Sequence, residues 1–259
     1  MGIFDFLRKD KSTKSAPPPA APAGDKKIAS LAKVAGDKRA QTYDRLEAIQ
    51  ALAEMKNPEA AAALLKRFTF SIDPSITDQE EKDLAFTGIV ASGKDVVPAV
   101  VEFCIKAEVL TLPLKVLRAL LPDEDYEAEL LDLLDKFDTE YARNVEPKIQ
   151  IIMALEDMVS EDVRESVERF LEDVNETVRF HAVQTLFAQK GQESIGPMVK
   201  MLATEESVRV KNKVAEGMLL RGWVIPPELR DAAREALRDA GGYTIGADGK
   251  IAKSSRAFG

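Results

Sequence analysis

The apolar residues of this chain recur in a pattern that repeats about every thirty residues. Six windows of eight residues have apolar side chains at the fourth, fifth and eighth positions, and successive windows start 37, 31, 35, 31 and 32 residues apart. Apolar groups at i, i+1 and i+4 lie on one side of a helix, so each window predicts a helix that buries this side. The windows are residues 45–52, 82–89, 113–120, 148–155, 179–186 and 211–218.

A break and a second amphipathic segment follow each window. After the first window, Asn57 and Pro58 form a typical cap and first-turn pair, and Ser160 can cap the segment after the fourth window. One helical pair cannot bury its apolar side alone, so successive pairs are expected to stack into a solenoid. We therefore predict an all-α fold of about six helical pairs over residues 28–240.

Two segments resemble the HEAT and HEAT-like repeat family. Residues 175–183 (Asn-Glu-Thr-Val-Arg-Phe-His-Ala-Val) and 206–209 (Glu-Ser-Val-Arg) are similar to the acidic-or-amide, Val-Arg, Ala-rich opening of these repeats. The resemblance covers roughly residues 40–240, although the second and third windows lack the Val-Arg pair. It implies a right-handed superhelix whose second helices line the concave side. It implies no particular activity, because this fold serves many.

The two ends of the chain have patterns of their own. Residues 1–11 form a short amphipathic peptide, and the Pro- and Ala-rich residues 12–27 predict a disordered linker. In residues 241–259, two glycines precede short alternating runs around an Asp-Gly turn, which predicts a β-hairpin. We expect this hairpin to cover the last helical pair.

One internal connection, residues 69–78, is longer than the others. The residues at its end, Thr77-Asp78-Gln79-Glu80, match a capping box. The sequence therefore predicts that Thr77 caps the next helix.

The counts of cysteine, histidine and charge exclude several kinds of site. With Cys104 as the single cysteine and His181 as the single histidine, zinc and di-iron clusters and most nucleophile–histidine triads cannot be built. We therefore expect no metal, no cofactor and no catalytic residues, and a buried Cys104. The net charge of −8 argues against binding to duplex nucleic acid, which needs a clustered cationic surface.

The acidic residues are concentrated in the middle of the chain. Residues 123–179 contain nineteen Asp or Glu and six Lys or Arg. If the second helices face inward, some of these carboxylates line a concave acidic strip suited to a basic partner. The alternative is a solvated face whose acidic first turns complement helix dipoles. The candidate partner-binding residues are Asp125, Glu129, Asp132, Glu161, Glu165 and Glu168.

The N-terminal peptide contains a second candidate surface. Phe4, Phe6 and Leu7 precede the basic residues Arg8, Lys9 and Lys11. Three interpretations are open: docking into a partner's groove, folding back on the solenoid, or weak contact with an anionic membrane through residues 1–11.

These observations favour a non-enzymatic scaffold or adaptor that binds a protein partner with a basic surface. No stretch reaches the ~18 apolar residues of a membrane-spanning helix, and the N-terminus lacks a secretory apolar region, so a cytoplasmic location is expected. One alternative is a peripheral adaptor at the inner face of the membrane, recruited by the N-terminal segment. Another is a subunit of a HEAT-like lyase.

Overall fold

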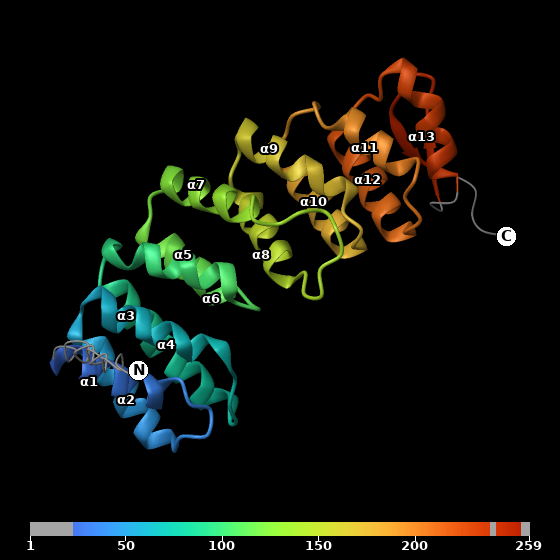
Figure 1. The fold of residues 1–259 in the computed structure, drawn as a ribbon. Helices are drawn as coiled ribbons and strands as arrows, with labels where there is room; N and C mark the ends of the chain where they lie inside the picture. Colours follow the sequence, from blue (N-terminus) through green and yellow to red (C-terminus); the bar gives the residue numbers. More distant parts are fainter. Residues whose placement is uncertain (1–22, 239–241, 255–259) are drawn as a thin grey trace, which may run out of the picture.

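The computed structural model describes residues 23–238 and 242–254. These residues form thirteen α-helices, five short 3₁₀ segments and one two-stranded antiparallel sheet, which confirms a mostly helical fold with a C-terminal hairpin. Figure 1 shows the helices following one another along an arc. The odd-numbered helices are α1 (Ala23–Ala35), α3 (Pro58–Leu64), α5 (Val97–Lys106), α7 (Asp123–Leu134), α9 (Glu161–Glu168), α11 (Ile195–Leu202) and α13 (Arg230–Leu237). The even-numbered helices are α2 (Thr42–Met55), α4 (Ser75–Ala91), α6 (Thr111–Leu120), α8 (Glu146–Ala154), α10 (Glu176–Ala188) and α12 (Val208–Arg221). The 3₁₀ segments are η1 (Leu65–Thr69), η2 (Lys94–Val96), η3 (Leu155–Asp157), η4 (Arg169–Glu172) and η5 (Pro227–Leu229).

The helices form two rows. In the even row α2 packs on α4, and each even helix in turn packs on the next as far as α12. The odd row runs in the same way from α1 to α9, and α11 packs on α13. Figure 1 places the even row along the inner, lower-right edge of the arc and the odd row along its outer edge. All six apolar windows lie in the even row, the fourth running on into η3.

The core lies between the two rows and is filled by the apolar positions of the windows. In α2 these are Ala48, Ile49 and Leu52, and in α10 the matching residues are Ala182, Val183 and Leu186, all buried. Burying a Val, Leu or Ile side chain contributes about 1.5–3 kcal/mol. The repeat in the sequence is therefore the repeat of the core.

A small residue occupies the seventh position of every window, and two of these residues are glycines in close contact with a neighbouring helix. A Cβ atom on Gly88 would lie 2.5 Å from the Cβ of Ala53 in α2. A Cβ on Gly217 would collide with the ring of Phe187 in α10. The absence of a side chain thus sets the spacing between these even helices. In α6 the corresponding residue, Ala119, is exposed.

Two helix starts differ from the predicted ones. α1 begins at Ala23, so residues 23–27 are helical although the linker was expected to extend to residue 27. α4 begins at Ser75, so Thr77 lies inside the first turn and is not its cap. The reason is that Asp78 turns back to accept hydrogen bonds from the Ile72 N–H at 3.1 Å and from Arg67 at 2.6 Å.

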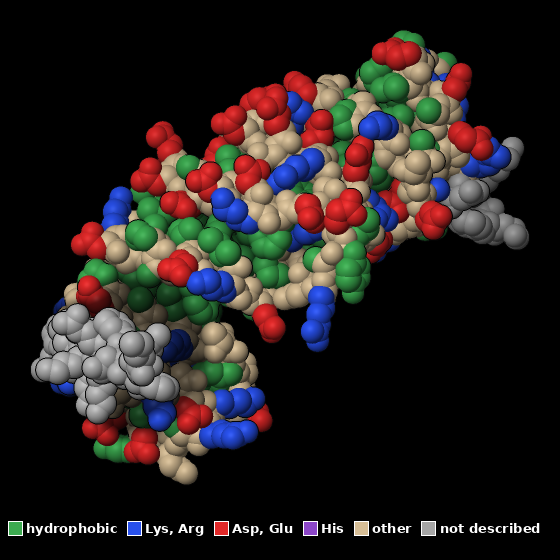
Figure 2. All heavy atoms as spheres, viewed as in Figure 1, with side chains coloured by type: hydrophobic (Ala, Val, Ile, Leu, Met, Phe, Trp, Pro, Cys, Tyr) green, Lys and Arg blue, Asp and Glu red, His purple; other side chains and the backbone are tan. Residues whose placement is uncertain are grey.

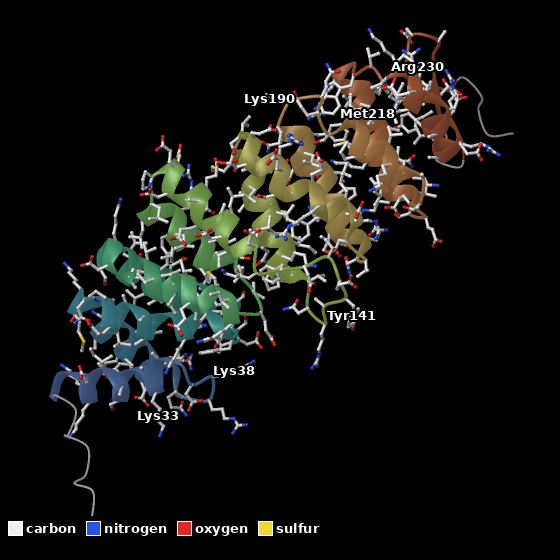
Figure 3. The ribbon with its side chains drawn as sticks, turned by 45° about the horizontal axis from the view of Figure 1, so that its top comes forward. Lys33, Lys38, Tyr141, Lys190, Met218 and Arg230 are labelled. Carbon is white, nitrogen blue, oxygen red and sulfur yellow. The ribbon has the colours of Figure 1, made fainter. Side chains whose placement is uncertain are left out.

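The C-terminal hairpin consists of β1 (Tyr243–Ile245) and β2 (Ile251–Lys253). β1 contacts α13 and β2 contacts α12, with Ile251 buried. Arg230, labelled in Figure 3, donates hydrogen bonds to the carbonyl oxygens of Ile225, Ala247 and Asp248. The hairpin is thus fastened to the last helices.

Candidate functional site

The three predicted carboxylates of α7 share one face of that helix. Asp125, Glu129 and Asp132 are spaced by four and three residues, which places them on neighbouring turns. Asp125 and Asp132 are exposed, and no cation lies within ion-pair distance of any of the three among the described residues. Partial burial raises the pKa of Glu129, and the neighbouring charges of Asp132 and Asp125 raise it further. α7 therefore carries uncompensated negative charge.

The three predicted carboxylates of α9 have a different environment, because all of them surround Arg164. Its guanidinium lies 2.5 Å from Glu161, 3.3 Å from Glu165 and 2.7 Å from Glu168. The hydrogen bond to Glu161 is the main cause of the raised pKa of Arg164, and the Arg164 hydrogen bond also lowers the pKa of Glu161. The charge of α9 is therefore partly neutralised.

The two helices are joined by a capping contact. The hydroxyl of Ser160 accepts from the Val163 N–H at 3.2 Å, which caps α9 as predicted, and it donates to Glu127 of α7 at 2.5 Å. In Figure 2 the acidic side chains gather along the upper edge of the molecule, where Figure 1 shows α7 and α9. This is the outer edge of the arc, so the expectation of a concave acidic strip was wrong. The carboxylates form an outer acidic face.

The other predicted site residues, Phe4, Phe6 and Leu7, lie outside the described residues.

A series of buried ion pairs was missed by the sequence analysis. Arg45 of α2 and Arg67 of η1 both donate to Glu81 of α4, at 2.7 and 2.6 Å, and all three side chains are almost fully buried. Arg67 also donates to Asp78 at 2.6 Å. Since each buried charge has an oppositely charged partner, the large cost of burying them is offset.

The same device recurs in the C-terminal half. Lys148 of α8 pairs with Asp173 at 2.6 Å, and Arg179 of α10 pairs with Glu205 at 2.7 Å. Asp173 and Glu205 each stand two residues before a helix cap and accept its backbone N–H. The signal was present: the first position of five of the six windows is Lys or Arg, and the third window has Pro113 instead.

A cationic cluster surrounds an aromatic ring between α10 and α12. The Arg209 guanidinium lies 3.8 Å and the Lys213 ammonium 5.2 Å from the centre of the Phe180 ring. His181 meets the same ring edge-on, and its buried Nδ1 has no hydrogen-bond partner among the described residues. Burial lowers the pKa of His181, and the charge of Arg209 lowers it further. Both effects favour the neutral form of this imidazole over its protonated form.

The Cys104 thiol and possible metal-binding groups are the remaining candidates for catalytic chemistry. Cys104 is buried as expected, and burial raises the pKa of its thiol to about 12, so it is not a nucleophile at neutral pH. Within residues 23–238 and 242–254, no group of three His, Cys, Asp or Glu side chains is placed to hold a metal ion.

None of the described helices is by itself long and apolar enough to cross a membrane. α4 together with residues 94–106 reaches that length, with a bend of 107° between them.

Comparison with known proteins adds little. No protein-family model matches the chain, and no curated protein matches it. Among solved structures, one matching chain is described as "Computational Design of Self-Assembling Cyclic Protein Homooligomers". It is 13% identical to this chain, the match covers 84% of this chain and 78% of that chain, and the TM-score is 0.15. A likeness this weak supports no argument.

Proposed function

We propose that this chain is a HEAT-like α-solenoid that works as a non-enzymatic scaffold for a protein partner in the cytoplasm. In the proposed arrangement six pairs stack in a right-handed superhelix, with the hairpin as a cap. The contacts of α1, which packs along α2 and touches α3, support pairing each odd helix with the even helix that follows it. The pairs are then α1–α2 through α11–α12, and the helix with the apolar window is the second of each pair.

The proposed partner carries a basic segment that binds the outer acidic face formed by α7 and α9. The observation that supports this proposal is that three neighbouring carboxylates of α7 have no ion-pair partner among the described residues. Asp125, Glu129 and Asp132 repel one another, since like charges at these spacings destabilise a helix by a few tenths of a kcal/mol per pair. Within residues 23–238 and 242–254, no Lys or Arg forms an ion pair with these carboxylates that would relieve the repulsion. A bound Lys- or Arg-rich segment relieves it.

The carboxylates of α9 extend the outer acidic face, and their positions are fixed by ion pairs. Glu161 and Glu165 are more than 60% exposed, and Arg164 holds both in place. The N-terminal residues Phe4, Phe6 and Leu7 are proposed to contribute a tethered docking peptide. Apolar side chains in such a peptide supply contact area that an exposed charge pair does not, because exposed ion pairs contribute about 0–1 kcal/mol each.

The test neutralises α7 without changing its shape. The variant Asp125→Asn/Glu129→Gln/Asp132→Asn removes three carboxylates from α7, where Glu129 is partly buried and the other two are exposed. The matched control Asp44→Asn/Glu47→Gln/Glu54→Gln removes three exposed carboxylates from α2. Binding of a labelled Arg- and Lys-rich peptide is measured by fluorescence polarisation at 50 and 150 mM salt. We expect at least tenfold weaker binding for the α7 variant and under twofold for the control. Equal loss in both variants, or no loss in the first, would sink the proposal.

A further inference from the structure

An apolar groove lies where the odd helices end and the even helices begin. It has a volume of about 360 Å³ and is lined by Phe68, Phe103, Ala107 and Val109, among others. Phe103 belongs to the last turn of α5, and Phe68 belongs to η1, which continues α3. Val109, which lines the groove, is 52% exposed, and covering an exposed apolar side chain is favourable.

The groove is continuous with a second hollow. That hollow has a volume of about 470 Å³, shares Phe68, Thr69 and Val109 with the first, and extends along α6 to Lys115. Two hydrogen bonds tie the α5–α6 connection to the segment around α8: Asn144 donates to the Glu108 carbonyl oxygen, and Gln150 accepts from the Leu110 N–H. The described part of the chain has no equivalent segment over Phe68 and Val109.

We propose that, while no partner is bound, the N-terminal segment of the same chain, residues 3–7, docks in this groove. These residues read Ile-Phe-Asp-Phe-Leu, and their two phenylalanines and two aliphatic side chains match the apolar lining. Asp5 finds an ammonium group in Lys115, which lines the second hollow and has no ion-pair partner among the described residues. The exposed Glu108 on the rim offers a carboxylate to Arg8 or Lys9.

The tether is long enough for this contact. α1 has 13 residues and is therefore about 20 Å long, and at its end Gly36 contacts Lys66 of η1, two residues before Phe68. The groove thus lies about one helix length from Ala23. The fifteen residues between Leu7 and Ala23 span up to about 45 Å when extended at ~3.1 Å per residue. A tether of this kind gives a local concentration on the order of 1 mM, so a weak contact is enough.

Cross-linking in the full-length chain tests the proposal. In a Cys104→Ala background, Phe6→Cys/Val109→Cys is compared with Phe6→Cys/Val174→Cys, since Val174 is 57% exposed and lies in the α9–α10 connection. Under mild oxidation we expect the Val109 pair to form an intramolecular disulfide at least tenfold faster, identified by peptide mass spectrometry. Equal rates for the two pairs overturn the proposal, and so does a product that is a disulfide-linked dimer, which assigns the groove to a second copy.

A second experiment changes only residues of the N-terminal segment and none in the packed helices. The variant is Phe4→Ser/Phe6→Ser, and both substituted residues lie outside the described part of the chain. Its effect is measured as the hydrogen-exchange rate of the backbone amides of residues 107–112. We expect exchange there to quicken at least threefold, with no change at residues 174–178. Unchanged exchange at the groove overturns the proposal. Neither experiment involves the outer acidic face, so this inference and the proposed function fail separately.

Discussion

The junction between α2 and α4 and the junction between α6 and α8 use the same apolar window but are held together differently. At the first, Arg45 reaches across to Glu81, and Gly88 lets the two helices come close. At the second, Pro113 takes the place of the basic residue, and the seventh window position of α8 is the half-buried Ala154. There the hydrogen bonds of Gln150 to Leu110 and Thr111 join the elements. The apolar pattern thus makes helices stack, and the first and seventh window positions decide how firmly. We expect the arc to bend most easily between α6 and α8.

The largest expected effect is at the firm junction. Glu81→Gln leaves Arg45 and Arg67 buried without a full counter-charge, and breaking a buried pair in this way costs about 3–5 kcal/mol. Chemical denaturation followed by circular dichroism measures the loss. The control is Glu80→Gln, an exposed neighbour expected to change the free energy of unfolding by less than about 0.5 kcal/mol. Similar stabilities for the two variants would refute a structural role for the ion pairs.

Lys148→Met tests whether the C-terminal pairs work in the same way. It strands Asp173 as a buried carboxylate, and we expect a loss of about 3 kcal/mol. In the double variant Lys148→Met/Asp173→Leu most of this loss should return. About 1 kcal/mol should remain lost, because Asp173 also accepts the Asn175 N–H at 2.8 Å. If the double variant is no more stable than the single one, the charge pair is not the source of the effect.

Gly217→Ala addresses the seventh position. Its new Cβ collides with the Phe187 ring, and overpacking of this kind costs about 1–3 kcal/mol. The matched change at an exposed seventh position, Ala119→Ser in α6, is expected to be neutral within about 0.5 kcal/mol because Ala119 is exposed. The melting temperatures of both variants give the comparison, and an equally destabilised Ala119→Ser would contradict the explanation that the Phe187 contact causes the loss.

Gln150→Ala removes the polar contacts specific to the loose junction. It leaves the Leu110 N–H without its acceptor, for a loss of about 1 kcal/mol, well below that of Glu81→Gln. Thermal unfolding of the two variants side by side gives the ranking. A loss as large as that of Glu81→Gln would mean that the junctions are equally firm.

The smallest expected effect is that of Glu129→Gln, which should increase the free energy of unfolding, whereas the preceding variants decrease it. Because burial and neighbouring charges raise the pKa of Glu129 in the folded chain, its ionised form disfavours folding. Stability contributed by this group is full below its unfolded pKa and is lost as the pH rises through the higher folded pKa. Glu129→Gln should therefore stabilise the chain by about 0.2–0.5 kcal/mol at pH 7. The gain should vanish in urea titrations at pH 4, and a gain that persists there would point to another cause.

The sequence predicted much of this fold because the core repeats with the helix period. Each window lies in an even helix, and the hairpin and the burial of Cys104 were expected from local patterns. The start of α4 was missed because Asp78 bonds to Arg67, eleven residues away, in place of the local cap. The side of the arc on which α7 and α9 lie was also missed, since it depends on α1, whose first residues resemble linker. Local composition does not contain such contacts.

The hairpin turn has a consequence for how the chain can vary over evolutionary time. Arg230 binds backbone carbonyl groups, and every residue type supplies the same carbonyl, so Ala247 is free to drift. Gly249 is not: its φ of +84° and a Cβ position only 2.6 Å from the Ile225 carbonyl oxygen and 2.7 Å from Arg230 exclude any side chain. Among homologues, Arg230 and Gly249 should therefore be inherited together, and the loss of one should accompany the loss of the other.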